Sequence, residues 1–186
     1  MTGLGARLAV GLVHYPVLNK AGETVTSSVT TLDIHDLARV CRTYGVGSLY
    51  IITPLPAQAR LAERVARHWT QGFGADYNPS RAEALGILKV VDSIDTMLDN
   101  LRLDARRVAV AVTSARAVMN EWDRVALLFG TAHGLADSVM ERAGIALEPI
   151  EGAPGFNHLP VRCAAAVILD RLLGSRGAKS EDHESG

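Results

Sequence analysis

The stretch DIHDLARVCRTYGVGSLYII, residues 33–52, indicates the fold class of this chain. Its first half carries apolar residues at helical spacing, which predicts a helix that Asp33 caps and Gly45 ends. Its second half, residues 47–52, is an apolar run that predicts a buried strand closed by Thr53-Pro54. A helix followed at once by a strand that is apolar throughout is typical of an α/β domain with a parallel sheet.

The same alternation continues on both sides of this stretch. Further strands are predicted at residues 8–13, 87–91, 108–112 and 126–129. Further helices are predicted at residues 56–71, 78–84, 94–101 with Asp92 or Ser93 as cap, 135–143 and 161–173. We therefore expect one α/β domain over residues 1–174, with a mainly parallel sheet flanked by helices. Residues 175–186 lack apolar periodicity and are expected to be a disordered tail.

The composition restricts the partners of the protein. Of its 186 residues 48% are hydrophobic, and 19 basic and 20 acidic residues leave a formal net charge of -1. This near-neutral total excludes a basic coat for nucleic acid, so a polyanion has to meet a local patch. Two groups of arginines offer such patches: Arg60, Arg64 and Arg67 on one helix face, and Arg102, Arg106 and Arg107 before a strand. An ordinary solvated surface is the alternative for each group.

Cysteine usage and the first residues narrow the class of protein further. Cys41 and Cys163 lie in predicted helices with no partner at metal-ligand spacing, so we expect two core residues and no metal site. The apolar run within residues 1–16 is too short for a signal peptide or a membrane span. We therefore expect a cytoplasmic protein without a membrane partner.

Candidate binding residues gather where predicted strands end, which is where α/β domains bind ligands. Small and polar residues follow two strands or precede the last helix: Thr113, Ser114, Gly130, Thr131, His133, Gly134, Gly152, Asn157 and His158. Residues 17–31 form a long segment rich in Thr and Ser, typical of a substrate loop, with Asn19 and Thr31 as candidate contacts. The common phosphate-loop and GxGxxG motifs are absent from the sequence.

Two segments resemble motifs of the SPOUT superfamily, which comprises RNA methyltransferases that use S-adenosylmethionine (SAM). Residues 33–45 are similar to its first motif: Arg39 and Gly45 stand at the usual spacing, and Asp33 stands where Asn is usual. The sequence VAVTSAR, residues 110–116, looks like the strand end that meets the cofactor.

Two later segments continue the resemblance in the right order. LLFGTAHGLADSV, residues 127–139, is similar to the Gly-x-x-x-Gly-Leu cofactor loop, with Ala132 where many relatives carry Glu. PIEGAPGFNHLPVRCAAAVIL, residues 149–169, resembles the knot loop and the final helix, with His158 at the place of the usual Asn and Asn157 before it. A bacterial subgroup similar to the C-terminal part of tRNA (guanine-N1)-methyltransferases is the nearest resemblance.

The resemblance implies a fold, a cofactor and an assembly. The fold is an α/β domain with a deep C-terminal trefoil knot, assembled as a homodimer, and the substrate is structured RNA, either tRNA or rRNA. SAM is implied to bind mainly to backbone groups of three loops, at Thr113, Ser114, Gly130, Thr131, His133, Gly134, Ile150, Gly152, Asn157, His158, Leu159 and Val161. The apolar final helix also favours a dimer, because it has more hydrophobic surface than a short tail can cover.

The residues that act on the acceptor are open to more than one interpretation. Arg39 would bind a phosphate or stabilise negative charge on a hydroxyl, as the resemblance implies for 2′-O transfer. Asp33 or Asp36 would instead take a proton from a base nitrogen. His35 and Tyr15 are candidates to orient or stack on an extruded nucleotide. A solvated charge at Arg39 and a helix-capping pair at His35 and Asp36 are the simpler alternatives.

Two other functions fit the same residues. Asp33, Ala132 and His158 depart from the common motif, which would suit a catalytically silent knotted protein that binds the cofactor or RNA. Methylation of a protein or a small molecule is the second alternative.

Overall fold

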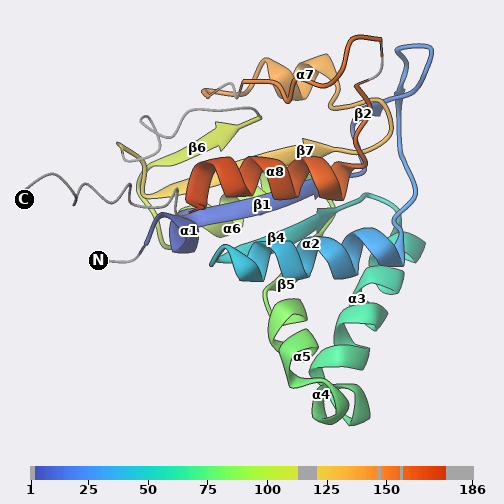
Figure 1. Cartoon of the computed structure of the whole chain (residues 1–186), viewed down its shortest axis with the longest axis vertical. Helices are drawn as coiled ribbons and strands as arrows, with labels where there is room; N and C mark the ends of the chain where they lie inside the picture. Colours follow the sequence, from blue (N-terminus) through green and yellow to red (C-terminus); the bar gives the residue numbers. More distant parts are fainter. Residues whose placement is uncertain (1–2, 113–120, 146–147, 156, 175–186) are drawn as a thin grey trace, which may run out of the picture.

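A five-stranded parallel sheet forms the centre of the computed structural model, which describes residues 3–112, 121–145, 148–155 and 157–174 (Figure 1). Its strands are β1 (Leu8–Val13), β4 (Ser48–Ile52), β5 (Leu88–Val91), β6 (Val108–Ala111) and β7 (Arg124–Gly130), in the order β5-β4-β1-β7-β6. Each pair of neighbours in this sheet is parallel, which confirms the prediction. Strand β1 is buried at every position because strands flank it on both sides and helices cover both faces.

The register brings the ends of the three central strands to one edge of the sheet. Val13, the last residue of β1, pairs with Ile52 at the end of β4 and with Gly130 at the end of β7. The loops that follow β1, β4 and β7 therefore start side by side. This edge, the strand-end edge, is where the sequence predicts ligand binding.

Helices cover the sheet on both faces. On one face α2 (Thr31–Thr43) and α8 (Val161–Leu173) lie beside each other (Figure 1), and Ile34 and Leu37 of α2 belong to the same core as Val10 and Leu12 of β1. On the other face α6 (Ile94–Arg102) packs Met97 against Tyr50 of β4. Successive side chains of β1 point to opposite faces of the sheet and thus belong to two separate cores.

Three helices form an arm that extends from the α2 side of the sheet (Figure 1). The helical arm consists of α3 (Pro56–Thr70), α4 (Phe73–Tyr77) and α5 (Pro79–Leu85). Pro56 stands in the first turn of α3, and the side chain of Asn78 caps α5 by accepting a hydrogen bond from the Arg81 backbone N–H. The sequence predicts α3 and α5, whereas α4 was not expected.

The start of α2 differs from the sequence prediction. Thr30, not Asp33, is the N-cap: its Oγ1 accepts a hydrogen bond from the Asp33 backbone N–H at 3.1 Å. Asp33 lies inside the first turn and is buried. The predicted cap at Asp33 is therefore wrong, because a second side chain that caps well stands three residues earlier. Ser93 does cap α6, as one of the two predicted alternatives.

Other short elements were missed or misjudged. The segment 17–31 contains a small hairpin, β2 (Val17–Leu18) with β3 (Thr24–Val25), and a short α1 (Leu4–Arg7) precedes β1. Helix α7 (Asp137–Met140) is shorter than the predicted helix at 135–143. Cys41 is buried as predicted, but the prediction of a core position for Cys163 is wrong because its side chain is exposed.

Within the described residues, no helix combines the length and the apolar character that a membrane span needs.

Candidate active site

A cavity of about 500 Å³ opens at the strand-end edge. Its walls come from the loop before α2, the turn after β7 and the start of α8. We call it the strand-end cavity; among its lining residues are Asp33, Gly130, Thr131, Gly134, Leu159, Val161 and Arg162. Five of the predicted cofactor residues, Gly130, Thr131, Gly134, Leu159 and Val161, thus line one cavity although they come from two separate loops.

The turn after β7 needs glycine at two positions. A Cβ on Gly130 would lie 2.5 Å from the Leu135 backbone N and 2.6 Å from the Gly134 carbonyl carbon. Gly134 has φ +110°, which L side chains rarely adopt. Ala132 lies between them with φ 52°. The turn is therefore folded tightly on its own backbone at Gly130, and Gly130, Ala132 and Gly134 all line the strand-end cavity.

A buried polar chain ties the segment before α2 to this turn. The Ser27 hydroxyl forms hydrogen bonds with Nδ1 of His14, at 3.0 Å, and with Thr131 Oγ1. Thr131 Oγ1 in turn donates to the Val13 carbonyl at 3.0 Å. His14 is fully buried, and burial lowers its pKa to about 4, although the nearby Asp33 carboxylate raises it. The sequence analysis missed His14 and Ser27, which no motif marks.

Two acidic residues of α2 meet one arginine of α8. Nε of Arg162 lies 3.1 Å from Oδ2 of Asp36, and its Nη1 lies 3.5 Å from Oδ1 of Asp33. Asp33 also accepts a 2.6 Å hydrogen bond from Thr30 Oγ1. Asp33 and Asp36 are thus brought together as predicted, but each already has a cationic partner, Arg162, which the sequence analysis did not single out.

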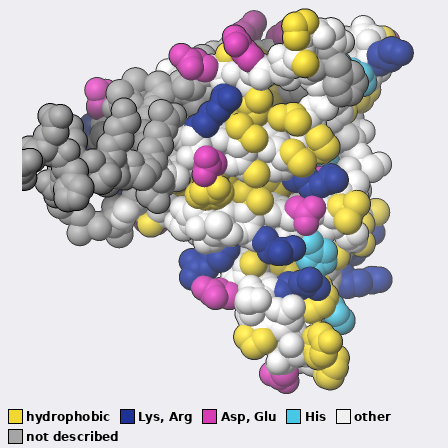
Figure 2. Space-filling view, viewed as in Figure 1, with side chains coloured by type: hydrophobic (Ala, Val, Ile, Leu, Met, Phe, Trp, Pro, Cys, Tyr) yellow, Lys and Arg dark blue, Asp and Glu magenta, His cyan; other side chains and the backbone are white. Residues whose placement is uncertain are grey.

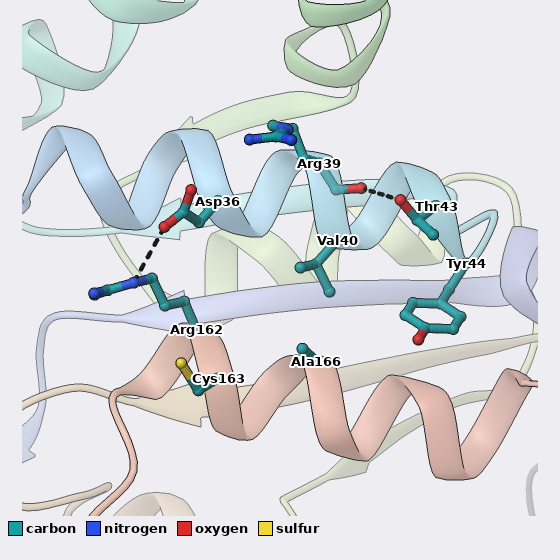
Figure 3. Close-up of a pocket in the computed structure, with 8 residues that line it drawn as sticks. All are labelled: Asp36, Arg39, Val40, Thr43, Tyr44, Arg162, Cys163 and Ala166. Atoms are coloured by element: carbon teal, nitrogen blue, oxygen red, sulfur yellow. Dashed lines mark hydrogen bonds and ion pairs between the residues drawn. The ribbon is translucent and has the colours of Figure 1, made fainter.

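A neighbouring groove runs between α2 and α8 (Figure 3). This groove, of about 440 Å³, is lined by Asp36, Arg39, Val40, Thr43, Tyr44, Arg162, Cys163 and Ala166. Figure 3 shows Asp36 directed toward Arg162, whereas the Arg39 side chain extends from the side of α2 that faces away from α8. Arg39 is exposed, and it does not line the strand-end cavity of its own chain.

His35 is placed against the helical arm instead. Its ring meets Trp69 of α3 edge to face at 5.8 Å between ring centroids. Burial lowers the pKa of His35, and the positive charge of Arg81 lowers it further. Packing against the arm accounts for its position.

The candidate substrate residues do not gather at the strand-end cavity. Tyr15 is 42% exposed and lines a different cavity of about 250 Å³ with Ser93 and Arg142. Asn19 accepts backbone hydrogen bonds from Ala21 and Glu23, which closes the β2–β3 hairpin. Thr31 is the exposed first residue of α2.

The remaining cofactor candidates lie on the loops around the cavity. In the loop before α8, the Asn157 side chain donates to the Ile150 carbonyl at 2.8 Å, while Gly152 and His158 are exposed. His133 is exposed, and its backbone N–H donates to the Leu18 carbonyl at 3.0 Å. Thr113 and Ser114 lie outside the described residues.

A parallel sheet with a cavity at its strand ends, walled by a glycine turn, is the arrangement in which α/β domains commonly bind small ligands. Residues 7–174 match the model of a family described as SAM-dependent RNA methyltransferase. The chain belongs to this family. This match agrees with the family that the four sequence motifs resemble.

Solved structures share the fold at low sequence identity. The SpoU methyltransferase AviRb from Streptomyces viridochromogenes aligns with a TM-score of 0.58 and 15% identity, over 92% of this chain and 60% of that one. The TrmH/SpoU tRNA modifying enzyme of A. aeolicus aligns with a TM-score of 0.54 and 16% identity, over 92% of this chain and 76% of that one.

Curated relatives match the sequence more closely. The tRNA (guanine-N(1)-)-methyltransferase of Oleidesulfovibrio alaskensis is 44% identical over 181 residues, which are 91% of this chain but 43% of that protein. The chain therefore spans less than half the length of this relative. An uncharacterized protein of Aquifex aeolicus is 36% identical over 88% of this chain and 87% of its own length.

The strand-end cavity fits SAM by an observation independent of these relatives. Its volume lies within the usual range of small-ligand sites, and Gly130, Gly134 and other residues without charge make up most of its lining. Among the residues that the structure describes, no group of His, Cys, Asp and Glu is arranged to hold a metal ion.

Proposed function

We propose that this chain transfers a methyl group from SAM in the strand-end cavity to a tRNA or an rRNA. The observation that carries the proposal is the cavity itself, where the glycine turn after β7 faces the start of α8 in a family of RNA methyltransferases. Bound SAM supplies an electrophilic methyl group. The protein has to hold the donor, align the acceptor and accommodate the proton that the acceptor loses.

The donor is held mainly by backbone groups of the loops around the cavity. Gly130, Thr131 and Gly134 line one wall, with His133 on the same turn, and Leu159 and Val161 line the opposite wall. The Asn157 amide fixes the Ile150 carbonyl and so closes the loop that carries Gly152 and His158. Thr113 and Ser114, which lie outside the described residues, are proposed as further donor contacts.

On the acceptor side we propose Arg39 as the residue that contacts the RNA. Arg162 already engages both Asp33 and Asp36, which leaves these carboxylates fewer free lone pairs to take a proton. Arg39 forms no ion pair with any described residue, so its guanidinium is available to a phosphate or to a hydroxyl that develops negative charge. This favours transfer to a ribose hydroxyl over transfer to a base nitrogen.

A homodimer would bring Arg39 to a donor cavity. Within one chain Arg39 points away from α8 and lies outside the strand-end cavity. We propose that the groove between α2 and α8, with Val40, Tyr44 and Ala166 in its lining, receives the same face of a second copy. Arg39 of each copy would then serve the donor cavity of the other.

We further propose three properties that accompany this function. The loop before α8 and α8 itself form the C-terminal trefoil knot. Residues 1–174 act as one domain and residues 175–186 as a tail. The enzyme works in the cytoplasm, on the RNA found there.

The relatives named tRNA (guanine-N(1)-)-methyltransferases suggest tRNA as the first RNA to test. This chain covers only 43% of such a relative, so the nucleotide and the atom need a direct measurement. A catalytically silent binding protein is not favoured, because the family match extends over residues 7–174. Methylation of a protein or a small molecule has no support from any feature of the site.

The test uses purified full-length protein, methyl-labelled SAM and total RNA from cells that lack the protein. Label in one RNA fraction supports the proposal, and digestion to nucleosides separates ribose from base methylation. Donor binding with no label in any RNA fraction would contradict it. Repeating the binding measurement with EDTA tests whether a metal takes part.

A further inference from the structure

The tip of the helical arm, residues 56–85, carries two exposed aromatic side chains. Phe73 and Tyr77 are 79% and 74% exposed. Their rings are stacked, with centroids 5.7 Å apart and an angle of 20° between the ring planes. They stand four residues apart in α4, so both project from one face of the helix. Large apolar side chains this exposed usually mark a contact surface.

The arm presents this pair on a fixed support. Gly74 packs closely on α3, since a Cβ there would lie 2.2 Å from the His68 carbonyl oxygen. Arg81 of α5 stacks on the Trp69 ring of α3 at 4.4 Å. Gly72 adopts φ +69° and allows the sharp reversal between α3 and α4. Contacts among the three helices of the arm therefore fix the position of α4, although the two rings that it carries are exposed.

A row of arginines runs along the same arm. Arg60, Arg64 and Arg67 follow one another at helical spacing and are exposed. They lie on the face of α3 opposite its buried residue, Ala62. In the part of the chain that the structure describes, none of the three has an ion-pair partner. Figure 2 shows basic side chains, coloured as Lys or Arg, and His side chains gathered where the arm joins the body of the protein.

The acidic residues of the arm only partly offset this charge. Glu83 forms an ion pair with Arg42 of α2. Glu63 and Asp76 remain exposed. Four arginines, at positions 60, 64, 67 and 81, thus face three carboxylates, one of which is already engaged outside the arm. The arm is a local basic patch on a chain whose formal net charge is -1.

This combination fits single-stranded RNA better than a protein. Unstacked bases bind to aromatic rings with little regard to sequence, and arginines bind the phosphates between them. A stable protein interface needs a much larger apolar area than two side chains provide. The free arginines would be left without partners against an apolar protein surface.

The arm is also placed to act together with the active site. It starts near the strand-end edge, where the side chain of Gln58 accepts a 2.9 Å hydrogen bond from the Val29 backbone N–H. Helix α3 has 15 residues and therefore spans about 22 Å. The aromatic pair is thus held at a distance of several nucleotides from the strand-end cavity.

We propose that the helical arm docks a single-stranded segment of the RNA substrate, with bases stacked on Phe73 and Tyr77 and phosphates bound by Arg60, Arg64 and Arg67. This surface selects and orients RNA that has an unpaired segment at the arm's distance from the reacting nucleotide. The inference rests on the proposed function only for its substrate class, which is RNA.

The experiment measures binding of a labelled oligouridylate of about 12 nucleotides to the full chain by fluorescence anisotropy. The double variant Phe73→Ala/Tyr77→Ala should weaken binding by about tenfold or more, because stacking is lost while the fold is not touched. Arg64→Gln/Arg67→Gln should weaken it as well and should flatten the log–log salt dependence by about 1.4, or roughly 0.7 per lost phosphate contact. Leu103→Ala is the control, since Leu103 is an exposed apolar residue outside the arm, and this variant should bind within about twofold of the wild type.

Two results would overturn the proposal. One is wild-type affinity for the oligonucleotide in both arm variants. The other is an aromatic variant whose molar mass by light scattering changes while its RNA affinity does not, which would assign the pair to a contact between protein chains. Methyl transfer is scored separately: if the wild type methylates no RNA but its oligonucleotide affinity depends on the arm, the proposed function fails and the docking surface stands.

Discussion

Arg162 in the first turn of α8 binds Asp36 of α2, with 3.1 Å between Nε and Oδ2. The same guanidinium reaches Asp33, so one side chain ties the last helix to the start of the first long helix at the edge of the strand-end cavity. Asp33 is only 8% exposed, and a carboxylate in that position depends on its partners. The pairing therefore supports both the stability of the fold and the shape of the cavity.

Removal of this arginine should destabilise the protein. For Arg162→Ala we expect a loss of about 1–3 kcal/mol in the free energy of unfolding, below the range for a fully buried pair because Arg162 is one-third exposed. Urea unfolding measures the change. Arg102→Ala is the control: its ion pair with Asp99 is exposed, so that variant should lose less than about 0.5 kcal/mol. Equal losses in the two variants would show that the ion pairs of Arg162 with Asp33 and Asp36 stabilise the fold no more than an exposed ion pair does.

Gly130→Ala should weaken donor binding. Its new Cβ would meet backbone atoms of Gly134 and Leu135 at 2.6 and 2.5 Å, so the turn has to move away from the cavity. We expect SAM affinity to fall by more than about tenfold in calorimetry, equivalent to 1.4 kcal/mol or more. Gly144→Ala is the matched control, because a Cβ there has open space around it. Unchanged affinity in the Gly130 variant would exclude this turn from the donor site.

The central strands could be predicted because their signal is local. Residues 8–13 and 47–52 are apolar runs, and strands covered on both faces need nothing else in the sequence. The start of α2 was mispredicted because Thr30 and Asp33 are both good capping residues. The sequence does not show which of the two precedes the first helical turn; in the structure Thr30 is the N-cap.

The missing parts of the site depend on contacts between distant segments. Arg162 and Asp33 are 129 positions apart, and Ser27 and Thr131 are 104 apart, so no spacing rule connects them. The motifs located the glycine turn because its backbone conformation demands particular residues. They could not show that Arg39 faces away from α8, since that follows from how two helices pack.

The buried His14 should make stability fall in mild acid. Its pKa is about 4 in the folded chain and 6.5, the ordinary value of histidine, in the unfolded chain, so below pH 6.5 the unfolded state binds a proton that the folded state does not. The stability is complete above pH 6.5 and is lost as the pH falls toward 4. Between pH 7.5 and pH 4.5 the loss should reach roughly 2–3 kcal/mol.

His14→Asn isolates this effect from all other titrating groups. The difference in unfolding free energy between wild type and variant, measured in urea at each pH, should shrink by that amount on acidification. A difference that stays constant from pH 7.5 to 4.5 would mean that His14 titrates in the folded protein as it does in the unfolded chain.

Arg39→Ala should separate donor binding from methyl transfer. Arg39 does not line the strand-end cavity, so SAM affinity should stay within about threefold of the wild type. The rate of transfer should fall by about a hundredfold or more, which is the scale for losing a charged contact in the transition state. Arg42→Ala is the control on the same helix, since Arg42 is engaged with Glu83. Transfer at the wild-type rate would mean that the charge of Arg39 is only solvated.

Mixing two inactive variants should restore activity if Arg39 acts across a dimer. The variants are Arg39→Ala, with an intact donor cavity, and Gly134→Val, which places a branched side chain at φ +110° and blocks donor binding. In a mixed dimer one site combines an intact cavity with an intact Arg39 from the other copy, and the second site lacks both. Random exchange makes half of the dimers mixed, so activity should reach roughly a quarter of the wild-type value. If Arg39 instead acts within its own chain, every site in the mixture lacks one component, and the mixture stays inactive. Light scattering on the same samples tests whether the protein is a dimer. A monomeric mass would contradict the proposal that Arg39 of one copy acts at the strand-end cavity of another.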